Sequence, residues 1–260
     1  MPDDRAPALC RHRGLRGRFR SLTGVCSSNQ GVHMEKTFEA AAGTFAPDLI
    51  VEVTTVCDRA CPGCYSPTLR THEDIEATHR SHPELFMSPE TLDLAIVDLG
   101  ERPDGMSLRG GEPSRHPRLA ALIEVAARHT HRVWVETHAR WLLGNNRFAA
   151  EWLSVLVRTG SIVKVSYDRM HSLSEPQLRA VVQALDEARV RWSVAITEPD
   201  SASFAATRRE CAWIEDERVI FQHKVRDHRL LVEPRLGTID VAGRHRARPT
   251  HKKALEVASA

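Results

Sequence analysis

Three cysteines that lie close together in the chain are the side chains best suited to chemistry. Cys57, Cys61 and Cys64 fall within residues 55–65, directly after an apolar, β-branched run. Thiols gathered on one short loop predict a metal site. Three protein ligands leave one coordination position of a four-iron cluster, or of a tetrahedral zinc ion, without a protein ligand, and catalysis at a metal needs such an open position. The spacing therefore favours a catalyst.

A second group of residues, Gly110, Gly111, Glu112 and Pro113, follows another short apolar stretch. Paired glycines suit a place where the backbone approaches a ligand closely or adopts a positive φ angle, and Glu112 offers an acceptor for an ammonium group. The other interpretation is an ordinary turn from a strand into a helix, where the charge of Glu112 is favourable near the helix N-terminus.

The C-x3-C-x2-C spacing, followed by Gly-Gly-Glu-Pro, resembles the radical S-adenosylmethionine (radical SAM) superfamily. The resemblance implies that Cys57, Cys61 and Cys64 bind one [4Fe–4S] cluster, whose fourth iron is chelated by S-adenosylmethionine (SAM). It also implies that Gly110 to Pro113 contact the amino group of SAM. Enzymes of this superfamily cleave SAM reductively to a 5′-deoxyadenosyl radical, which abstracts hydrogen from a substrate, while the protein supplies binding and orientation.

Two weaker motifs continue the resemblance in the same order along the chain. Residues 135–138 are similar to the family's Glu-Thr-Asn-Gly string, and residues 165–168 are similar to its Ser-x-Asp string. The resemblance implies that Thr137, Ser166 and Asp168 contact SAM. Each of them is interpreted equally well as a polar residue that ends a strand. No general acid or base is predicted.

The chain also departs from the family pattern. Many members carry an aromatic residue just before the third cysteine, where this chain has Gly63, so Tyr65 either takes over the adenine contact or covers the cluster loop. Arg109 occupies a position where a small hydroxyl residue is common, and His138 replaces the asparagine. These differences affect the expected adenine contacts and leave the expected cluster ligands unchanged.

Two further hypotheses compete with a radical SAM enzyme that acts on a small molecule or a peptide. One is an activating enzyme that generates a glycyl radical on a partner protein. The other is a non-catalytic Cys3His zinc module, in which His72 or His79 is the fourth ligand. For the enzyme, the resemblance implies an electron donor such as flavodoxin or ferredoxin. The substrate, the product and the fate of SAM are left open.

Strand-like and helix-like segments alternate, as expected for a parallel sheet with the site at the C-terminal ends of its strands. Strands are expected at 49–53, 106–108, 133–136, 162–166, 192–196 and 219–221, and helices at 89–99, 119–128, 148–158, 175–188 and 204–214. Six β-α units close only part of a barrel or form an open sheet. The resemblance implies the first of these, a partial (β/α)6 barrel.

The expected organisation is a basic N-terminal tail at 1–34, a radical SAM core at 35–224 and a short C-terminal extension at 225–260. The extension contains a candidate hairpin built from 230–232 and 238–241. Apart from the cysteine loop, Cys211 is the only cysteine after residue 34, which argues for a single iron–sulfur cluster.

The composition is sufficient for a full-sized hydrophobic core and gives no argument for a nucleic acid or membrane partner. Hydrophobic residues make up 42% of the chain, and 36 basic residues against 34 acidic ones leave a net charge of +2. No run approaches the roughly 18 apolar residues of a membrane span. Clustered free thiols predict a reducing compartment, and cytoplasm is the expected location.

Overall fold

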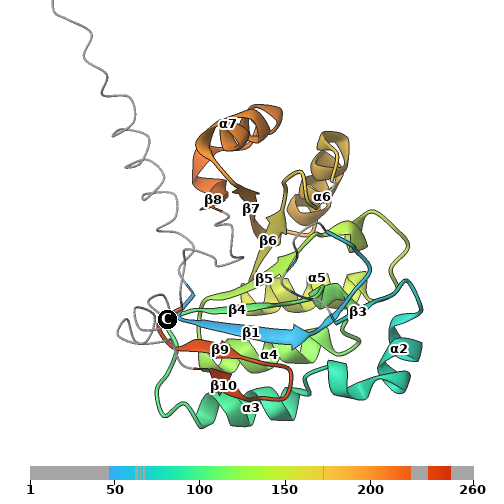
Figure 1. Ribbon diagram of the computed structural model, residues 1–260, viewed down its shortest axis with the longest axis vertical. Helices are drawn as coiled ribbons and strands as arrows, with labels where there is room; N and C mark the ends of the chain where they lie inside the picture. Colours follow the sequence, from blue (N-terminus) through green and yellow to red (C-terminus); the bar gives the residue numbers. More distant parts are fainter. Residues whose placement is uncertain are drawn as a thin grey trace, which may run out of the picture.

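A mostly parallel sheet, covered by helices on one face, forms the body of the protein (Figure 1). The computed structural model describes residues 47–61, 64, 66, 68–171, 173–223 and 234–246. The expected N-terminal tail and Tyr65 lie outside these residues, as does the 230–232 half of the expected hairpin. In the part of the chain described, no helix is long and apolar enough to cross a membrane.

Six strands follow one another in sequence order across the sheet, and all of them are parallel. They are β1 (Leu49–Thr54), β4 (Met106–Gly110), β5 (Val133–Thr137), β6 (Ile162–Ser166), β7 (Arg191–Glu198) and β8 (Val219–His223). Their progressive twist gives the fan seen in Figure 1. The prediction of a partial (β/α)6 barrel is confirmed.

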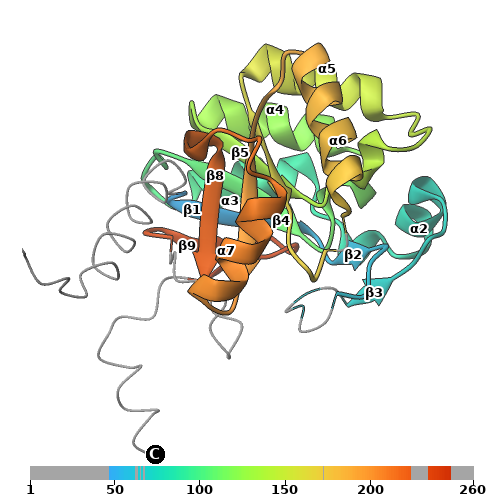
Figure 2. The same cartoon turned by 90° about the horizontal axis from the view of Figure 1, so that it is seen from above.

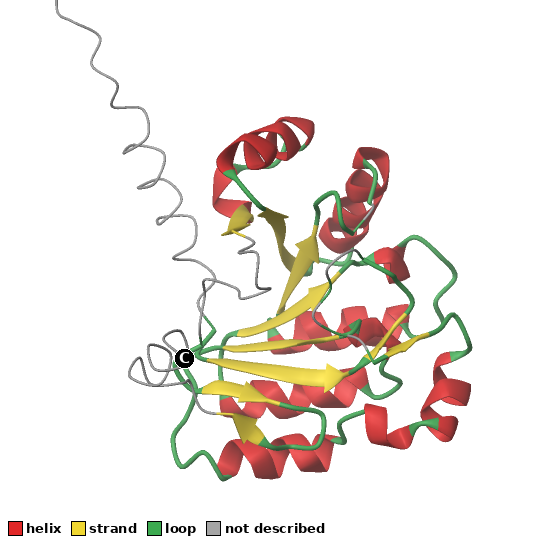
Figure 3. Cartoon of the chain, in the orientation of Figure 1, coloured by secondary structure: helices red, strands yellow, loops and turns green. Residues whose placement is uncertain are grey.

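Helices in the crossovers return the chain so that each strand runs parallel to the one before, and Figure 3 shows them along the outside of the sheet. They are α3 (Pro89–Val97), α4 (Leu119–His129), α5 (Ala149–Thr159), α6 (Glu175–Glu187) and α7 (Ser201–Glu210). Ser88 and Ser174 cap α3 and α6 through their side chains, and each helix has proline in its first turn. Gly160 ends α5 in the left-handed conformation.

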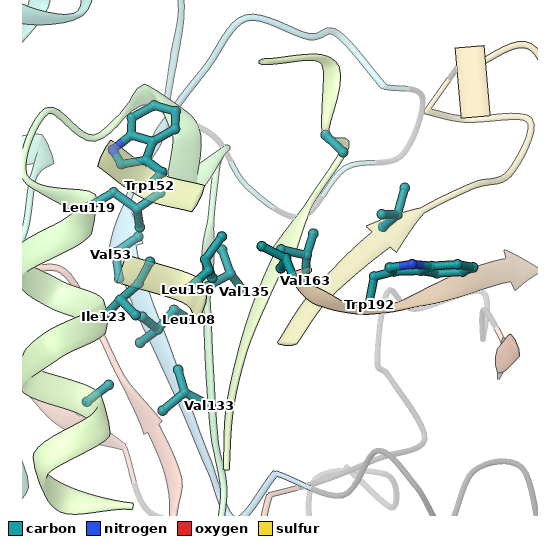
Figure 4. Packing of buried hydrophobic residues seen from close by; sticks show 14 of the residues in the cluster. Val53, Leu108, Leu119, Ile123, Val133, Val135, Trp152, Leu156, Val163 and Trp192 are labelled. Atoms are coloured by element: carbon teal, nitrogen blue, oxygen red, sulfur yellow. The ribbon is translucent and has the colours of Figure 1, made fainter. Parts of the chain in front are cut away.

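The core lies between the sheet and these helices. Val53 and Leu108 on the sheet meet Leu119 and Ile123 on α4, and Trp152 of α5 closes the layer (Figure 4). Because side chains alternate along a strand, every second residue points to the opposite face of the sheet, where a smaller cluster contains Trp134, Ala195 and Ile220.

The polar segment after the cysteine loop contains structure that the sequence did not predict. Residues 56–57 and 69–70 form a small parallel pair, β2 (Val56–Cys57) with β3 (Leu69–Arg70). The helix α2 (Ile75–Ser81) follows, with Asp74 accepting hydrogen bonds from the amides of its first turn. Figure 1 shows α2 and β3 beyond the tip of β1, and Figure 2 shows β2, β3 and α2 together on one side of the molecule. Short 3-10 turns at 83–85, 113–115, 140–142 and 216–218 complete the connections.

The last described residues join the main sheet. Strand β9 (Gly237–Ile239) pairs in parallel with β1, and β10 (His245–Arg246) pairs antiparallel with β9. Residues 238–239 therefore have β1 and β10 as partners. The helix expected at 204–214 begins and ends earlier, because Asp200 caps it at Ser201 and Cys211 terminates it.

Candidate active site

The cysteine loop and the Gly-Gly-Glu segment both follow neighbouring parallel strands, so they emerge at the same edge of the sheet. Strands β1 and β4 pair with Thr54 opposite Gly110. The amide of Gly111 donates to the carbonyl of Thr54 at 2.7 Å, and the amide of Glu112 donates to the carbonyl of Val56 at 2.9 Å. Two motifs far apart in the sequence are thus joined backbone to backbone.

Close packing explains both glycines. A Cβ atom on Gly110 would lie 2.1 Å from the Thr54 carbonyl oxygen, and one on Gly111 would lie 2.2 Å from the Val56 carbonyl oxygen. Gly110 also has a φ angle of 149°. The sequence predicted that the backbone approaches a ligand closely here or adopts a positive φ angle. The structure shows the positive φ at Gly110 and a close approach to the backbone that leads into the cysteine loop, and the ligand contact stays a prediction.

The three thiols differ in their surroundings. Cys57 is buried, Cys61 is half-buried and Cys64 is exposed, with its Sγ donating to the carbonyl of Ser66 at 2.6 Å. Burial, with the nearby Glu112 carboxylate, raises the pKa of the Cys57 thiol to about 12. Burial also raises the pKa of Cys61, and the neighbouring Cys64 adds to this.

Metal ligation suits this donor set, although the thiols are not gathered in advance. Among the described residues, no group of three His, Cys, Asp or Glu side chains is arranged to hold a metal ion. The Sγ of Cys57 accepts a hydrogen bond from the Arg59 amide at 3.3 Å, an interaction that also stabilises a thiolate bound to iron. The three thiols lie on one loop, and one of them already accepts a hydrogen bond from a backbone N–H. This donor set fits an iron–sulfur cluster whose binding brings the three ligands together.

Glu112 is a buried junction with well-defined hydrogen-bond partners. Its Oε1 accepts from the Thr137 hydroxyl at 2.6 Å and from the Ser114 amide at 3.0 Å, while its Oε2 accepts from the His138 amide at 3.0 Å. Pro113 starts the 3-10 turn that Glu112 caps. The contacts of Glu112 in this structure are those of a residue that caps the turn after a strand, as the second interpretation predicted. Contact between Glu112 and the amino group of SAM stays a prediction.

His138, which the sequence singled out only as a departure from the family, lies at the centre of the site. Its Nε2 is 2.9 Å from Asp58 Oδ1 and 3.4 Å from Glu112 Oε2. Its Nδ1 accepts the Arg140 amide at 3.1 Å. The net direction of its pKa is upward, because the two carboxylates outweigh burial. Although the two carboxylates favour the charged ring, a proton on Nδ1 would point at the Arg140 N–H, so we assign the ring as neutral with its proton on Nε2.

The remaining predicted SAM contacts are placed unevenly. Ser166 is half-buried at the end of β6, on the face of the sheet opposite the helices. Asp168 is buried, and its carboxylate accepts from the amides of Met170 and His171 and contacts the His171 ring. Asp168 lies near enough to Cys61 to raise the pKa of that thiol. Asp168 thus lies near the cysteine loop, but the contacts of its carboxylate are with residues 170 and 171 of its own turn.

Neither histidine proposed as a zinc ligand is held near the cysteines by a described contact. His72 is exposed. The ring of His79 packs edge-on against Phe86, with 5.0 Å between ring centroids.

A row of charged side chains crosses the face of the sheet opposite the helices, one or two residues before each strand ends. Glu52 pairs across the strands with Arg109, Glu136 pairs with Lys164, and Lys164 pairs with Ser193. Lys164 Nζ lies 2.6 Å from Glu136 Oε2. Although burial raises the pKa of Glu136, the charges of Lys164 and Arg109 outweigh it and lower that pKa. The sequence did not predict this row, because each member looks like an isolated polar residue in its strand.

Comparison with known proteins gives structural similarity only. No protein-family model matches the chain, and no curated protein matches it. The chain is similar to the solved structure of native anSMEcpe with bound AdoMet and Kp18Cys peptide, at 15% identity and a TM-score of 0.45, over 66% of this chain and 49% of that one. It is also similar to Streptococcus suis SuiB bound to the precursor peptide SuiA, at 14% identity and a TM-score of 0.33, over 78% and 56%.

A third similar structure is BtrN in complex with AdoMet and 2-DOIA, at 15% identity and a TM-score of 0.29, over 66% of this chain and 55% of that chain. The chain spans about half the length of the anSMEcpe structures that it matches.

Proposed function

We propose that the chain is a radical SAM enzyme that acts on a small-molecule or peptide substrate. The observation that carries the proposal is the direct backbone pairing of the cysteine-bearing segment with the Gly-Gly-Glu segment, through Gly111 to Thr54 and Glu112 to Val56. Two motifs that resemble one superfamily are adjacent in space, at the strand ends where a barrel of this kind carries its site.

In this proposal, Cys57, Cys61 and Cys64 hold one [4Fe–4S] cluster, which when bound supplies the electron that cleaves SAM to a 5′-deoxyadenosyl radical. The residues Gly110 to Pro113, with Thr137, Ser166, Asp168 and Tyr65, are the proposed SAM contacts. Glu112 supports this role because it is a buried acceptor near Cys57, as its effect on the pKa of that thiol shows. A buried carboxylate beside the loop favours a cation, and the SAM amino group is one.

Positive charge near the loop suits an anionic cluster. Arg59 and Arg70 both act to lower the pKa of Cys61, against the larger effect of burial. The pKa of Arg140 is lowered by burial and by the charge of Arg59 nearby. Guanidinium groups that crowd one another are stabilised when negative charge enters between them, and three thiolates with a reduced cluster bring such charge.

The test is anaerobic reconstitution with iron and sulfide, followed by 5′-deoxyadenosine measurement with SAM and dithionite. The wild type is compared with a Cys57→Ala, Cys61→Ala, Cys64→Ala triple variant. Cys211→Ala is the control, because Cys211 lies at the end of α7 and is not part of the cysteine loop. We expect iron binding and 5′-deoxyadenosine from the wild type and the control alone. A colourless wild type that binds zinc would overturn the proposal. A glycyl radical signal on a partner protein would instead identify an activating enzyme.

A further inference from the structure

We propose that His138 is a positioning residue that fastens the cysteine loop to the Gly-Gly-Glu segment through Asp58 and Glu112. This inference rests on the proposed function for the purpose of the loop. The fastening itself is a property of the protein without iron and is tested there.

The geometry gives His138 one task for each ring nitrogen. Nδ1 accepts the backbone N–H of Arg140 at 3.1 Å, which orients the ring and leaves the proton on Nε2. Nε2 then donates to Asp58 Oδ1 at 2.9 Å, with Glu112 Oε2 at 3.4 Å on its other side. The side chain of His138 is 5% exposed and that of Glu112 is 3% exposed, so water competes little for these contacts.

The position of Asp58 explains why this contact bears on the metal ligands. Asp58 directly follows Cys57, while His138 is 80 residues away at the end of β5. The next residue along the loop, Arg59, returns its amide to Cys57 Sγ at 3.3 Å. The hydrogen bond from His138, at the end of β5, to Asp58 therefore holds the turn that contains Cys57 in place.

Glu112 connects the same bond to the proposed SAM site. Its Oε2 accepts from the amide of His138 and lies near the ring of the same residue. An ammonium group that binds Oε2 competes with the ring for this oxygen, and the Nε2 proton is then left to Asp58. SAM binding at Glu112 would accordingly tighten the hold on the cysteine loop.

The experiment measures iodoacetamide alkylation of Cys57 in the metal-free, full-length protein, followed by mass spectrometry of the peptide that contains it. Two variants separate the contact made by Nδ1 of His138 from the contact made by Nε2. In His138→Asn, the amide oxygen can still accept the Arg140 N–H but the side chain is too short to reach Asp58. In His138→Gln, the amide nitrogen reaches about as far as Nε2 and can donate. His131→Ala is the control, because His131 is exposed.

We expect His138→Asn to raise the alkylation rate of Cys57 about tenfold, because a hydrogen bond to a charged group is lost, and His138→Gln to stay within about threefold of the wild type. The rate at Cys211 in the same samples should be unchanged, which reports an intact fold. Equal rates in His138→Asn and wild type would overturn the inference, as would an equal rise in both variants.

The two proposals fail separately. If the wild type forms no 5′-deoxyadenosine but the alkylation rates differ as expected, the fastening stands and the enzymatic function falls. If 5′-deoxyadenosine is formed and the alkylation rates do not differ, the enzymatic function stands and the role of His138 falls. On reconstitution, we also expect His138→Asn to retain less iron per chain than His138→Gln.

Discussion

Individual side chains at this site serve more than one segment at once, and His116 shows the same principle close by. Its Nε2 lies 2.8 Å from the carbonyl of Met87, and its Nδ1 accepts the amide of Arg118 at 3.0 Å. Because a carbonyl only accepts, the neutral ring with its proton on Nε2 satisfies both contacts. Burial lowers the pKa of His116 to about 4 from an ordinary value of 6.5.

This pKa predicts a pH dependence of stability. Between pH 6.5 and 4 the unfolded chain binds a proton at His116 that the folded protein does not, so stability falls as the pH falls. The loss is about 3 kcal/mol across this window. Urea denaturation of the wild type and of His116→Gln at pH 7 and pH 4.5 measures it. The variant should be less stable at pH 7 and lose less on acidification; parallel losses in both proteins would contradict the assignment.

Residue chemistry is also where the sequence was most informative. The cysteine spacing and the Gly-Gly-Glu-Pro string lead directly to one edge of the sheet. The link between Asp58 and His138 could not be predicted, because it joins residues 80 positions apart through a side chain that looked like a departure from the family. Neither residue type nor local spacing carries that information.

Among the elements, β4 has the strictest steric requirement, because its end packs backbone to backbone on the segment after β1. We predict that Gly111→Ala destabilises the protein by about 3 kcal/mol, since its Cβ would lie 2.2 Å from a carbonyl oxygen that cannot move freely. Gly144→Ala is the control, because nothing lies within 4 Å of its Cβ position. Thermal and urea denaturation compare them; equal midpoints would contradict the close packing.

The charge row gives a second prediction at this scale. Breaking the buried pair with Lys164→Met removes the 2.6 Å partner of Glu136 and leaves it the Ser107 hydroxyl and the charge of Arg109, at a cost of at most about 3–5 kcal/mol. The double variant Lys164→Met, Glu136→Leu removes both charges and should recover most of that stability. Urea denaturation of Lys164→Met, of Glu136→Leu and of the double variant gives the coupling energy. Additive losses would show that the two side chains act independently.

The elements were predictable where their signals were local. All six parallel strands and the capped starts of α3 and α6 follow from apolar runs, serine caps and early prolines. Helix α2 was missed because its segment is polar, with Thr78 its only buried residue. Strand β9 was predicted as a strand, but its parallel partner β1 was not, because a distant pairing leaves no mark on a three-residue strand.

At the scale of the whole molecule, the two ends of the described chain depend on each other. The amide of Leu236 donates to the carbonyl of Asp48 at 2.7 Å, and the side chains of Leu236 and Ile239 are buried. Outside the backbone ladder, Arg235 pairs with Asp48 and Glu101. These contacts cover the edge of β1 that would otherwise be open.

We therefore predict that a variant ending at residue 233 is destabilised by about 3–6 kcal/mol, the value of two buried aliphatic side chains, and aggregates through the open edge of β1. A variant ending at residue 246 keeps β9 and β10 and is the matched control. Denaturation midpoints and light scattering distinguish the two. Equal stability and equal scattering would show that β9 contributes nothing to the sheet.

The pairing of β1 with β9 also imposes an order of events during synthesis. The chain emerges from the ribosome N-terminus first, at about 5–20 residues per second, so β1 waits roughly 10–40 s for the strand that covers its edge. Throughout that interval the strand leading into Cys57 lacks one of its neighbours. Until β9 is made, that open edge of β1 can pair with a strand of another chain, so slow synthesis of residues 55–236 favours misassembly at this edge.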